Sequence, residues 1–203
     1  MSDHNLRDAL IEAGAFFHER GWAPATGGNY SARTDTGLIL TASGTHKGHL
    51  RAEDLIATDA DGMPINDTRK TSAETALHVA LYAMDPAIGS VLHTHSPQAT
   101  VLSLHHAQAG VLGLQGYEML KAFAGITTHA TRLQLPILAN DQNIERLAAR
   151  AIPAIQATDA CAPGLLIAGH GLYAWGCDVA EARRHIEAFE FLFACELLQA
   201  QLR

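Results

Sequence analysis

Short apolar runs alternate with helix-like segments along this chain, and this alternation is the feature that most limits its possible folds. Ile88–His95 and Leu165–Ala168 have the length of buried strands, and Leu135–Leu138 is a third candidate. Strands interleaved with helices pack as a sheet with helices on its faces. Because tight turns are expected between several other neighbouring strands, we expect a mixed sheet in one α/β domain over residues 1–203.

The other elements are predicted from periodicity and turn residues. Helices are expected over about Asn5–Arg20, from Thr71–Glu74 to Met84, from Pro97 to Leu104, over Ile144–Ile152 and from about Asp178 to the chain end. Strands are expected at Tyr30–Arg33 and Leu38–Thr41, which form a hairpin, and at Leu55–Asp59. The pattern from Thr71 to Glu74 is that of a capping box, and Pro153 is expected to close its helix.

Composition limits the class of function. The net charge is −7 and no Lys/Arg run is present, so a nucleic-acid partner is not expected. A small phosphorylated ligand needs only one or two cations and some backbone N–H groups. Three widely spaced cysteines, no signal-peptide pattern and no apolar run of about 18 residues are typical of a soluble, cytoplasmic protein, with no membrane association.

Three of the twelve histidines indicate a metal site. His93 and His95 are two residues apart on an expected strand, so their side chains share one face. His170 follows an apolar run and has glycine on both sides, which allows close approach. Three neutral imidazoles with one open position form a known catalytic zinc site.

Taken alone, His93 and His95 have an alternative interpretation: they form hydrogen bonds in the core or face solvent. The other nine histidines are assigned mostly to surface or packing roles.

Enolisation of a ketone at such a site also needs an acid/base group. Glu74 and Glu118 are the two candidates, and spacing alone does not choose between them. The capping box already explains Glu74, whereas Glu118 has the alternative of an ordinary exposed helix residue. His78 lies on the helix after the capping box and is the most buried of the remaining histidines in this prediction.

Three turns rich in glycine and hydroxyl groups are candidates for phosphate binding. Their residues, with one lysine that follows the second turn, are Thr26, Gly28, Asn29, Ser43, Gly44, Lys47, Thr71 and Ser72. Ordinary turn chemistry explains each turn singly, so their value lies in combination with a metal site. The chain has no GxGxxG, Walker-type or G-x-S-x-G pattern, which leaves nucleotide-dependent and serine-hydrolase functions without support.

Five motifs in this order resemble the class II aldolase/adducin family. They are Thr26-Gly-Gly-Asn-Tyr-Ser31, Thr41-Ala-Ser-Gly44, Thr71-Ser-Ala-Glu74, His93-Thr-His95 and Gly169-His-Gly171. The resemblance implies a three-layer α/β/α fold and one Zn²⁺ per subunit. It also implies a small phosphorylated ketose substrate and a homotetramer with sites near subunit interfaces. Gly27 departs from the pattern, since many members have serine there.

Within the family, further segments resemble its dehydratases of methionine salvage. They are Gly21–Thr26, Ser43–Gly48, Gly116–Lys121 and Leu135–Gln142. In such dehydratases the glutamate that matches Glu118 is the acid/base, whereas the family's aldolases use the one that matches Glu74. The resemblance therefore implies a zinc-dependent hydro-lyase acting on a methylthio-substituted ketose phosphate. The alternatives are a sugar-phosphate aldolase, a pentulose-phosphate 4-epimerase or a non-catalytic adducin-like interaction domain.

Overall fold

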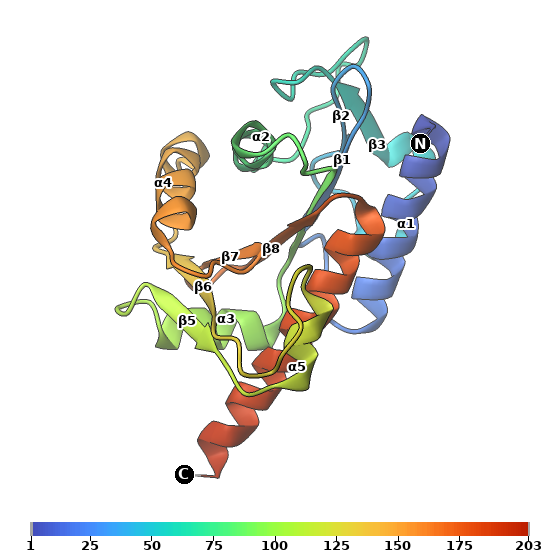
Figure 1. The fold of residues 1–203 in the computed structure, drawn as a ribbon. Coiled ribbons are helices and arrows are strands. Elements are labelled where there is room, and N and C mark those ends of the chain that lie inside the picture. Colours follow the sequence, from blue (N-terminus) through green and yellow to red (C-terminus); the bar gives the residue numbers. More distant parts are fainter. Residues whose placement is uncertain (1, 203) are drawn as a thin grey trace.

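The computed structural model describes residues 2–202, in which five α-helices pack on one eight-stranded sheet (Figure 1). The strands are β1 (Asn29–Arg33), β2 (Leu38–Thr41), β3 (Leu55–Thr58), β4 (Ser90–Thr94), β5 (Val111–Leu114), β6 (Leu133–Leu138), β7 (Gly164–Ile167) and β8 (Gly171–Gly176). Their order across the sheet is β3-β2-β1-β4-β8-β7-β6-β5. Only β6 and β7 pair in parallel among these strands of residues 2–202, so the predicted mixed sheet is confirmed.

The helices form a layer on each face of the sheet (Figure 1). One layer contains α1 (Asp3–Glu19), α3 (Pro97–His105) and α5 (Val179–Gln201), and the other contains α2 (Thr75–Met84) and α4 (Ile144–Ala157). Each layer encloses its own core, with Phe17 and Phe189 in the first and Leu81 and Leu147 in the second. The predicted α/β/α arrangement is confirmed, and the extent of the domain over residues 1–203 stays a prediction.

Helix starts and apolar faces follow the sequence pattern at both ends of the chain. On α1 the buried residues Leu6, Leu10 and Phe17 follow helical spacing, and they pack in the core beneath the sheet. Gly21, with φ of 73°, follows the end of this helix, as expected of a residue that adopts the left-handed region without strain. The N-cap Asp178 accepts a hydrogen bond of 2.7 Å from the Glu181 N–H, which begins α5.

The predicted capping box at Glu74 is wrong. With Thr71 as the cap the helix would begin at Ser72, but α2 begins three residues later, at Thr75, and the Glu74 side chain makes no capping hydrogen bond. The Glu74 N–H is instead bonded to the Ser72 hydroxyl at 3.2 Å. Because that hydroxyl serves the backbone before the helix, the Glu74 carboxylate is free to point away from the helix start.

Helix α4 corrects a second prediction, because it continues through Pro153 to Ala157. Proline lacks one helical hydrogen bond, but the buried residues Leu147, Ala151 and Ile155 extend one apolar face past it, and packing of this face keeps the helix intact. The strands β5 and β8 were not predicted.

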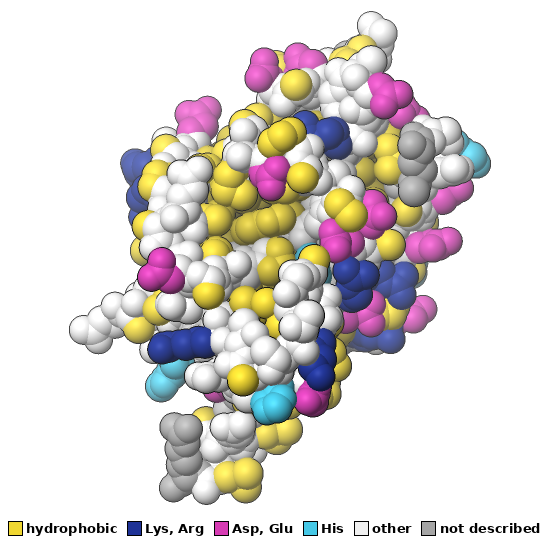
Figure 2. Space-filling model, viewed as in Figure 1, with side chains coloured by type: hydrophobic (Ala, Val, Ile, Leu, Met, Phe, Trp, Pro, Cys, Tyr) yellow, Lys and Arg dark blue, Asp and Glu magenta, His cyan; other side chains and the backbone are white. Residues whose placement is uncertain are grey.

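Three short 3-10 helices complete the chain: η1 (Lys47–His49), η2 (Ala52–Asp54) and η3 (Glu118–Ala122). On the face drawn in Figure 2, basic and acidic side chains are interspersed, and a hollow with hydrophobic walls lies between α2, α4 and the end of β8. That face therefore carries no basic stripe of the kind a nucleic acid needs. Within residues 2–202, no helix is both long and apolar enough to span a bilayer.

Candidate metal centre

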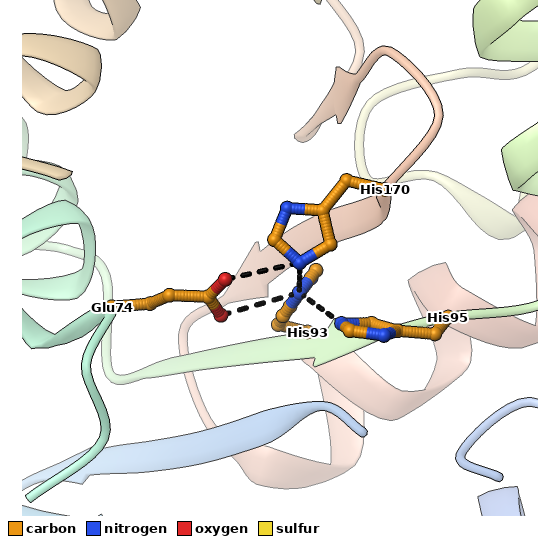
Figure 3. Close-up of side chains that lie close together, drawn as sticks. All are labelled: Glu74, His93, His95 and His170. Carbon is orange, nitrogen blue, oxygen red and sulfur yellow. Dashed lines mark hydrogen bonds and ion pairs between the residues drawn. The ribbon is translucent and has the colours of Figure 1, made fainter. Parts of the chain in front are cut away.

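The structure brings the three predicted histidine ligands together and adds Glu74 (Figure 3). The Nε2 atom of His93 lies 2.7 Å from Nε2 of His95 and 3.3 Å from Nε2 of His170. The Glu74 carboxylate faces the same point, with Oε1 3.0 Å from Nε2 of His170 and Oε2 3.4 Å from Nε2 of His93. Three nitrogens and a carboxylate thus converge on one small volume.

The pairing of β4 with β8 produces this convergence. His93 on β4 lies opposite Tyr173 on β8, and their rings stack at a centroid distance of 3.9 Å. Gly171 opens β8, and a Cβ at this position would lie 2.1 Å from the carbonyl oxygen of Thr94. Only glycine permits this close approach, and the approach places His170, in the turn between β7 and β8, beside the end of β4.

The electrostatics of the site favour neutral imidazoles. His93 donates its Nδ1–H to the Leu172 carbonyl at 2.9 Å, which leaves the Nε2 lone pair directed at the centre. Burial lowers the pKa of His93 well below its usual value and that of His95 to about 4. Burial alone would raise the pKa of Glu74, but the imidazoles of His93 and His170 hold it low. Neutral imidazoles with an ionised carboxylate are the donor set of a divalent metal ion.

A buried chain of hydrogen bonds supports Glu74 from behind. Asn29 donates its side-chain amide to Glu74 and accepts from Nε2 of His78. Nδ1 of His78 is 2.7 Å from the Ser31 hydroxyl, which is in turn 2.8 Å from the Tyr82 hydroxyl. His78 is fully buried, as predicted, but its place in this chain was missed. The signal was present, since Glu74 and His78 are four residues apart at the start of one helix.

A pocket of about 300 Å³ on one side of the metal centre collects most of the predicted phosphate-binding residues. Its lining includes Thr26, Gly28, Asn29, Ser43, Gly44, Lys47 and Ser72, together with Glu74 and His95. Thr71 is not part of this lining; its backbone forms a β-bridge with Ala42, which does line the pocket. The three turns, which are distant in sequence, therefore meet at one pocket.

The buried Lys47 supplies the positive charge of this pocket. Its Nζ donates to the carbonyl oxygens of Thr26 at 3.0 Å and Thr45 at 2.6 Å, and burial lowers its pKa to about 8. Gly28 has φ of 80°, and a Cβ there would lie 2.5 Å from the His93 carbonyl oxygen. Glycine at this position lets the turn approach the end of β4, so the pocket and the histidines adjoin.

A second pocket, of about 400 Å³, lies on the other side of the centre. Its lining includes Asn140, Asp141 and Gln142, which belong to a segment that resembled the dehydratases, and again Glu74 and His95. Because both pockets share two side chains of the cluster, the metal centre lies between a polar pocket with a lysine and a second cavity that has room for the rest of a small substrate.

Glu118, the other acid/base candidate, does not lie at the metal centre of its own chain. It lies on η3 with its side chain 70% exposed, and it pairs with Lys121 at 2.6 Å and His129 at 3.3 Å. The pairing with Lys121 lowers the pKa of Glu118. Glu118 lines neither pocket beside the cluster. The sequence resemblance thus favours Glu118 as the acid/base, whereas within one chain it is Glu74 that lies at the cluster.

A cluster of imidazoles and a carboxylate between two pockets, on an α/β/α fold, is the arrangement expected of an enzyme that uses a divalent metal ion and acts on small anionic molecules. The family described as Class II Aldolase and Adducin N-terminal domain matches residues 8–197, and the chain belongs to this family.

Among its relatives, a protein of Pseudomonas paraeruginosa (strain DSM 24068 / PA7) named methylthioribulose-1-phosphate dehydratase is 54% identical over 200 residues, which cover 97% of each chain. A protein of the same name from Pseudomonas savastanoi pv. phaseolicola (strain 1448A / Race 6) is 52% identical over 198 residues, which cover 97% of this chain and 96% of that one.

Solved structures agree in fold. An L-fuculose 1-phosphate aldolase superposes with a TM-score of 0.82 at 21% identity, over 100% of this chain and 89% of that one. The l-fuculose-1-phosphate aldolase from Thermus Thermophilus gives a TM-score of 0.79 at 24% identity, over 98% and 97% of the two chains. At this level of identity the likeness establishes the fold and not the reaction.

Proposed function

We propose that this chain catalyses the dehydration of 5-methylthioribulose 1-phosphate to 2,3-diketo-5-methylthiopentyl 1-phosphate in methionine salvage. The observation that carries the proposal is the 54% identity, over 97% of both chains, to a protein named for this reaction. The metal centre agrees with it, since a non-catalytic adducin-like domain has no need to keep three histidines and a carboxylate in contact.

The reaction breaks a C–H bond at C3 and a C–O bond at C4. A base takes the C3 proton, the C4 hydroxyl leaves as water after it gains a proton, and the resulting enol becomes the second ketone by proton transfer. A divalent ion bound here supplies Lewis-acid polarisation of the substrate ketone. Lys47 and the turns around it bind the phosphate and hold C1 in place, which orients the reacting carbons without entering the chemistry.

We assign Zn²⁺, one per subunit, as the ion, because a site made mainly of imidazoles suits zinc better than the hard cations. We further propose that the chain assembles as a homotetramer, as its family resemblance implies. A cytoplasmic location fits a phosphorylated substrate, since a charged metabolite does not cross a bilayer unaided.

The acid/base role goes to Glu118, acting on the metal centre of a neighbouring subunit. Two observations support this: the match of Gly116–Lys121 to the dehydratase segment, and the exposed position of Glu118 outside both pockets of its own chain. Glu74 instead lies against the histidines and is held by Asn29. Its proposed role is to orient the histidines and to position the ion and the substrate.

A substrate comparison tests the reaction. Purified protein is supplied with methylthioribulose 1-phosphate, fuculose 1-phosphate or ribulose 5-phosphate, with and without a chelator, and the products are followed by mass spectrometry. Chelator-sensitive loss of water from the first substrate is expected. Cleavage of fuculose 1-phosphate or epimerisation of ribulose 5-phosphate as the main activity would assign the chain to a sister reaction.

Subunit mixing tests the role of Glu118. Glu118→Gln and His95→Ala are each expected to be inactive, with the metal retained only in the first. Co-expression of the two should restore part of the activity, because one subunit then supplies the glutamate and the other supplies the histidines. Normal activity in Glu118→Gln with its metal retained removes Glu118 from the mechanism, and no recovery on mixing contradicts catalysis across subunits.

A further inference from the structure

A second group of three metal-ligating side chains, separate from the metal centre, occurs within residues 2–202. His18 lies in the last turn of α1, His46 caps η1 and His49 ends η1. One ring nitrogen of each lies within 4.8 Å of the others. The ring centroid of His46 is 4.6 Å from those of both His18 and His49. Zinc–nitrogen bonds of about 2.0–2.1 Å require nitrogens roughly 3.4 Å apart, so small rotations of the rings would complete a site.

The backbone holds His18 in an orientation suited to a ligand. Its Nδ1 is 3.2 Å from the carbonyl oxygen of Ala23, and because a carbonyl only accepts, this nitrogen carries the hydrogen. Nε2 is then the nitrogen with the free lone pair, which is the arrangement that metal-binding histidines adopt. A Cβ on Gly48 would lie 2.3 Å from Cδ2 of His18, so the glycine allows the imidazole to lie directly on η1.

We propose that His18, His46 and His49 bind one divalent transition-metal ion, which joins the end of α1 to the segment that carries Lys47. The donor set is imidazole only, which suits Zn²⁺, Ni²⁺, Co²⁺ or Cu²⁺ and disfavours Mg²⁺ and Ca²⁺. His49 is exposed, so solvent has access to the remaining coordination position. Nothing in this proposal depends on the reaction that the chain catalyses.

Binding changes the start of η1. Nδ1 of His46 accepts a hydrogen bond of 3.2 Å from the Gly48 N–H. A metal bond through Nδ1 takes the place of this hydrogen bond, and a bond through Nε2 moves the hydrogen to Nδ1 and breaks it. Either way, the ion replaces a local cap with a link between two elements. Because Lys47 lies between His46 and Gly48, the ion also stiffens the segment whose side chain enters the polar pocket.

The test counts metal ions on untagged protein, since a polyhistidine tag would bind the same ions. The protein is stripped with a chelator and titrated with Zn²⁺ against a chromophoric indicator. Two equivalents per chain are expected for the wild type and one for His18→Ala/His49→Ala. The matched control is His105→Ala/His106→Ala, which also removes two neighbouring imidazoles but no group of three, and it should keep two equivalents.

Circular dichroism in chelator checks that each variant is folded. Should the double variant fail to fold, the single variant His49→Ala tests the same point at an exposed position and should weaken the second equivalent by at least about tenfold. The proposal is overturned when the wild type binds a single equivalent, or when neither His49→Ala nor the double variant changes the second one.

Discussion

The buried hydrogen-bond chain behind Glu74 gives a prediction for His78→Leu. His78 is fully buried, and burial lowers its pKa to about 4, so it is neutral near pH 7. The neutral ring donates from Nε2 to Asn29 and accepts at Nδ1 from the Ser31 hydroxyl. Leucine has a similar volume but can neither donate nor accept a hydrogen bond, so the variant loses the bonds to both Asn29 and Ser31.

The expected cost follows from these two partners. The Asn29 side-chain oxygen loses its bond to His78, whereas the Ser31 hydroxyl keeps Tyr82 at 2.8 Å and can turn to the Val91 carbonyl, 3.4 Å away. A buried polar group left unpaired costs about 1–3 kcal/mol, which applies to Asn29, and the loss of one further hydrogen bond, from Ser31, costs about 1 kcal/mol. His78→Leu should therefore lower the free energy of unfolding by about 2–4 kcal/mol. Asn29 also loses its orientation toward Glu74, so metal affinity should fall by about tenfold or more.

Urea unfolding, followed by circular dichroism at one protein concentration and in the presence of a chelator, measures the free energy of unfolding of the metal-free protein. Metal affinity is measured separately by indicator competition. His185→Leu is the matched control, because His185 is also buried on a helix and lies outside the cluster. Among residues 2–202 its ring has one hydrogen bond, to the Trp175 carbonyl at 2.7 Å. This control variant should cost less, about 1 kcal/mol, and leave metal affinity unchanged. A His78→Leu protein within about 0.5 kcal/mol of the wild type would refute this reasoning, as would unchanged metal affinity.

Three further predictions concern charge and metal. Glu190 is buried, and this burial raises the pKa of its carboxyl from 4.5 to about 8. The folded chain therefore keeps a proton that the unfolded chain releases, so the free energy of unfolding falls as pH rises from about 4.5 to 8. Glu190→Gln should remove this loss, and equal pH profiles of the melting temperature in both proteins would contradict it. Lys47→Met should raise the KM for a phosphorylated substrate by about tenfold or more, with a smaller change in kcat, because the polar pocket loses its cation; steady-state kinetics that show an unchanged KM would exclude Lys47 from phosphate binding. Chelation should abolish turnover and added Zn²⁺ should restore it, and full activity in metal-free protein by elemental analysis would disprove metal dependence.

Most helices and the centre of the sheet were predictable because their signals are local. Apolar spacing on α1, the Asp178 cap of α5 and the apolar run of β4 are each contained in a few neighbouring residues. Strand β8 was missed because it begins with Gly171 and ends with Gly176, and glycine is more typical of turns than of strands. Strand β5 was missed because it is a short strand at the sheet edge with a glycine inside it.

The site was only partly predictable for a related reason. His93 and His95 share a face because of strand geometry, which a sequence displays directly. That His170 joins them depends on the register of β4 with β8, which no local pattern encodes. Glu74 was misread because the capping-box pattern fits its spacing, while the decision is made by Ser72 and Asn29, which take up the Glu74 N–H and carboxylate respectively.

The pairing of β4 with β8 also bears on how the chain matures. The proposed ligands His93 and His170 are separated by 77 positions, so the ion would have its complete binding site only after the middle of the sheet has closed. Contacts between such distant segments form late and slowly in folding. Metal uptake should therefore follow closure of the sheet, and the bound ion should then oppose its reopening. Until the ion binds, a newly made chain can reopen and be cleaved by proteases, so the supply of metal ions in the growing cell sets how long this exposure lasts.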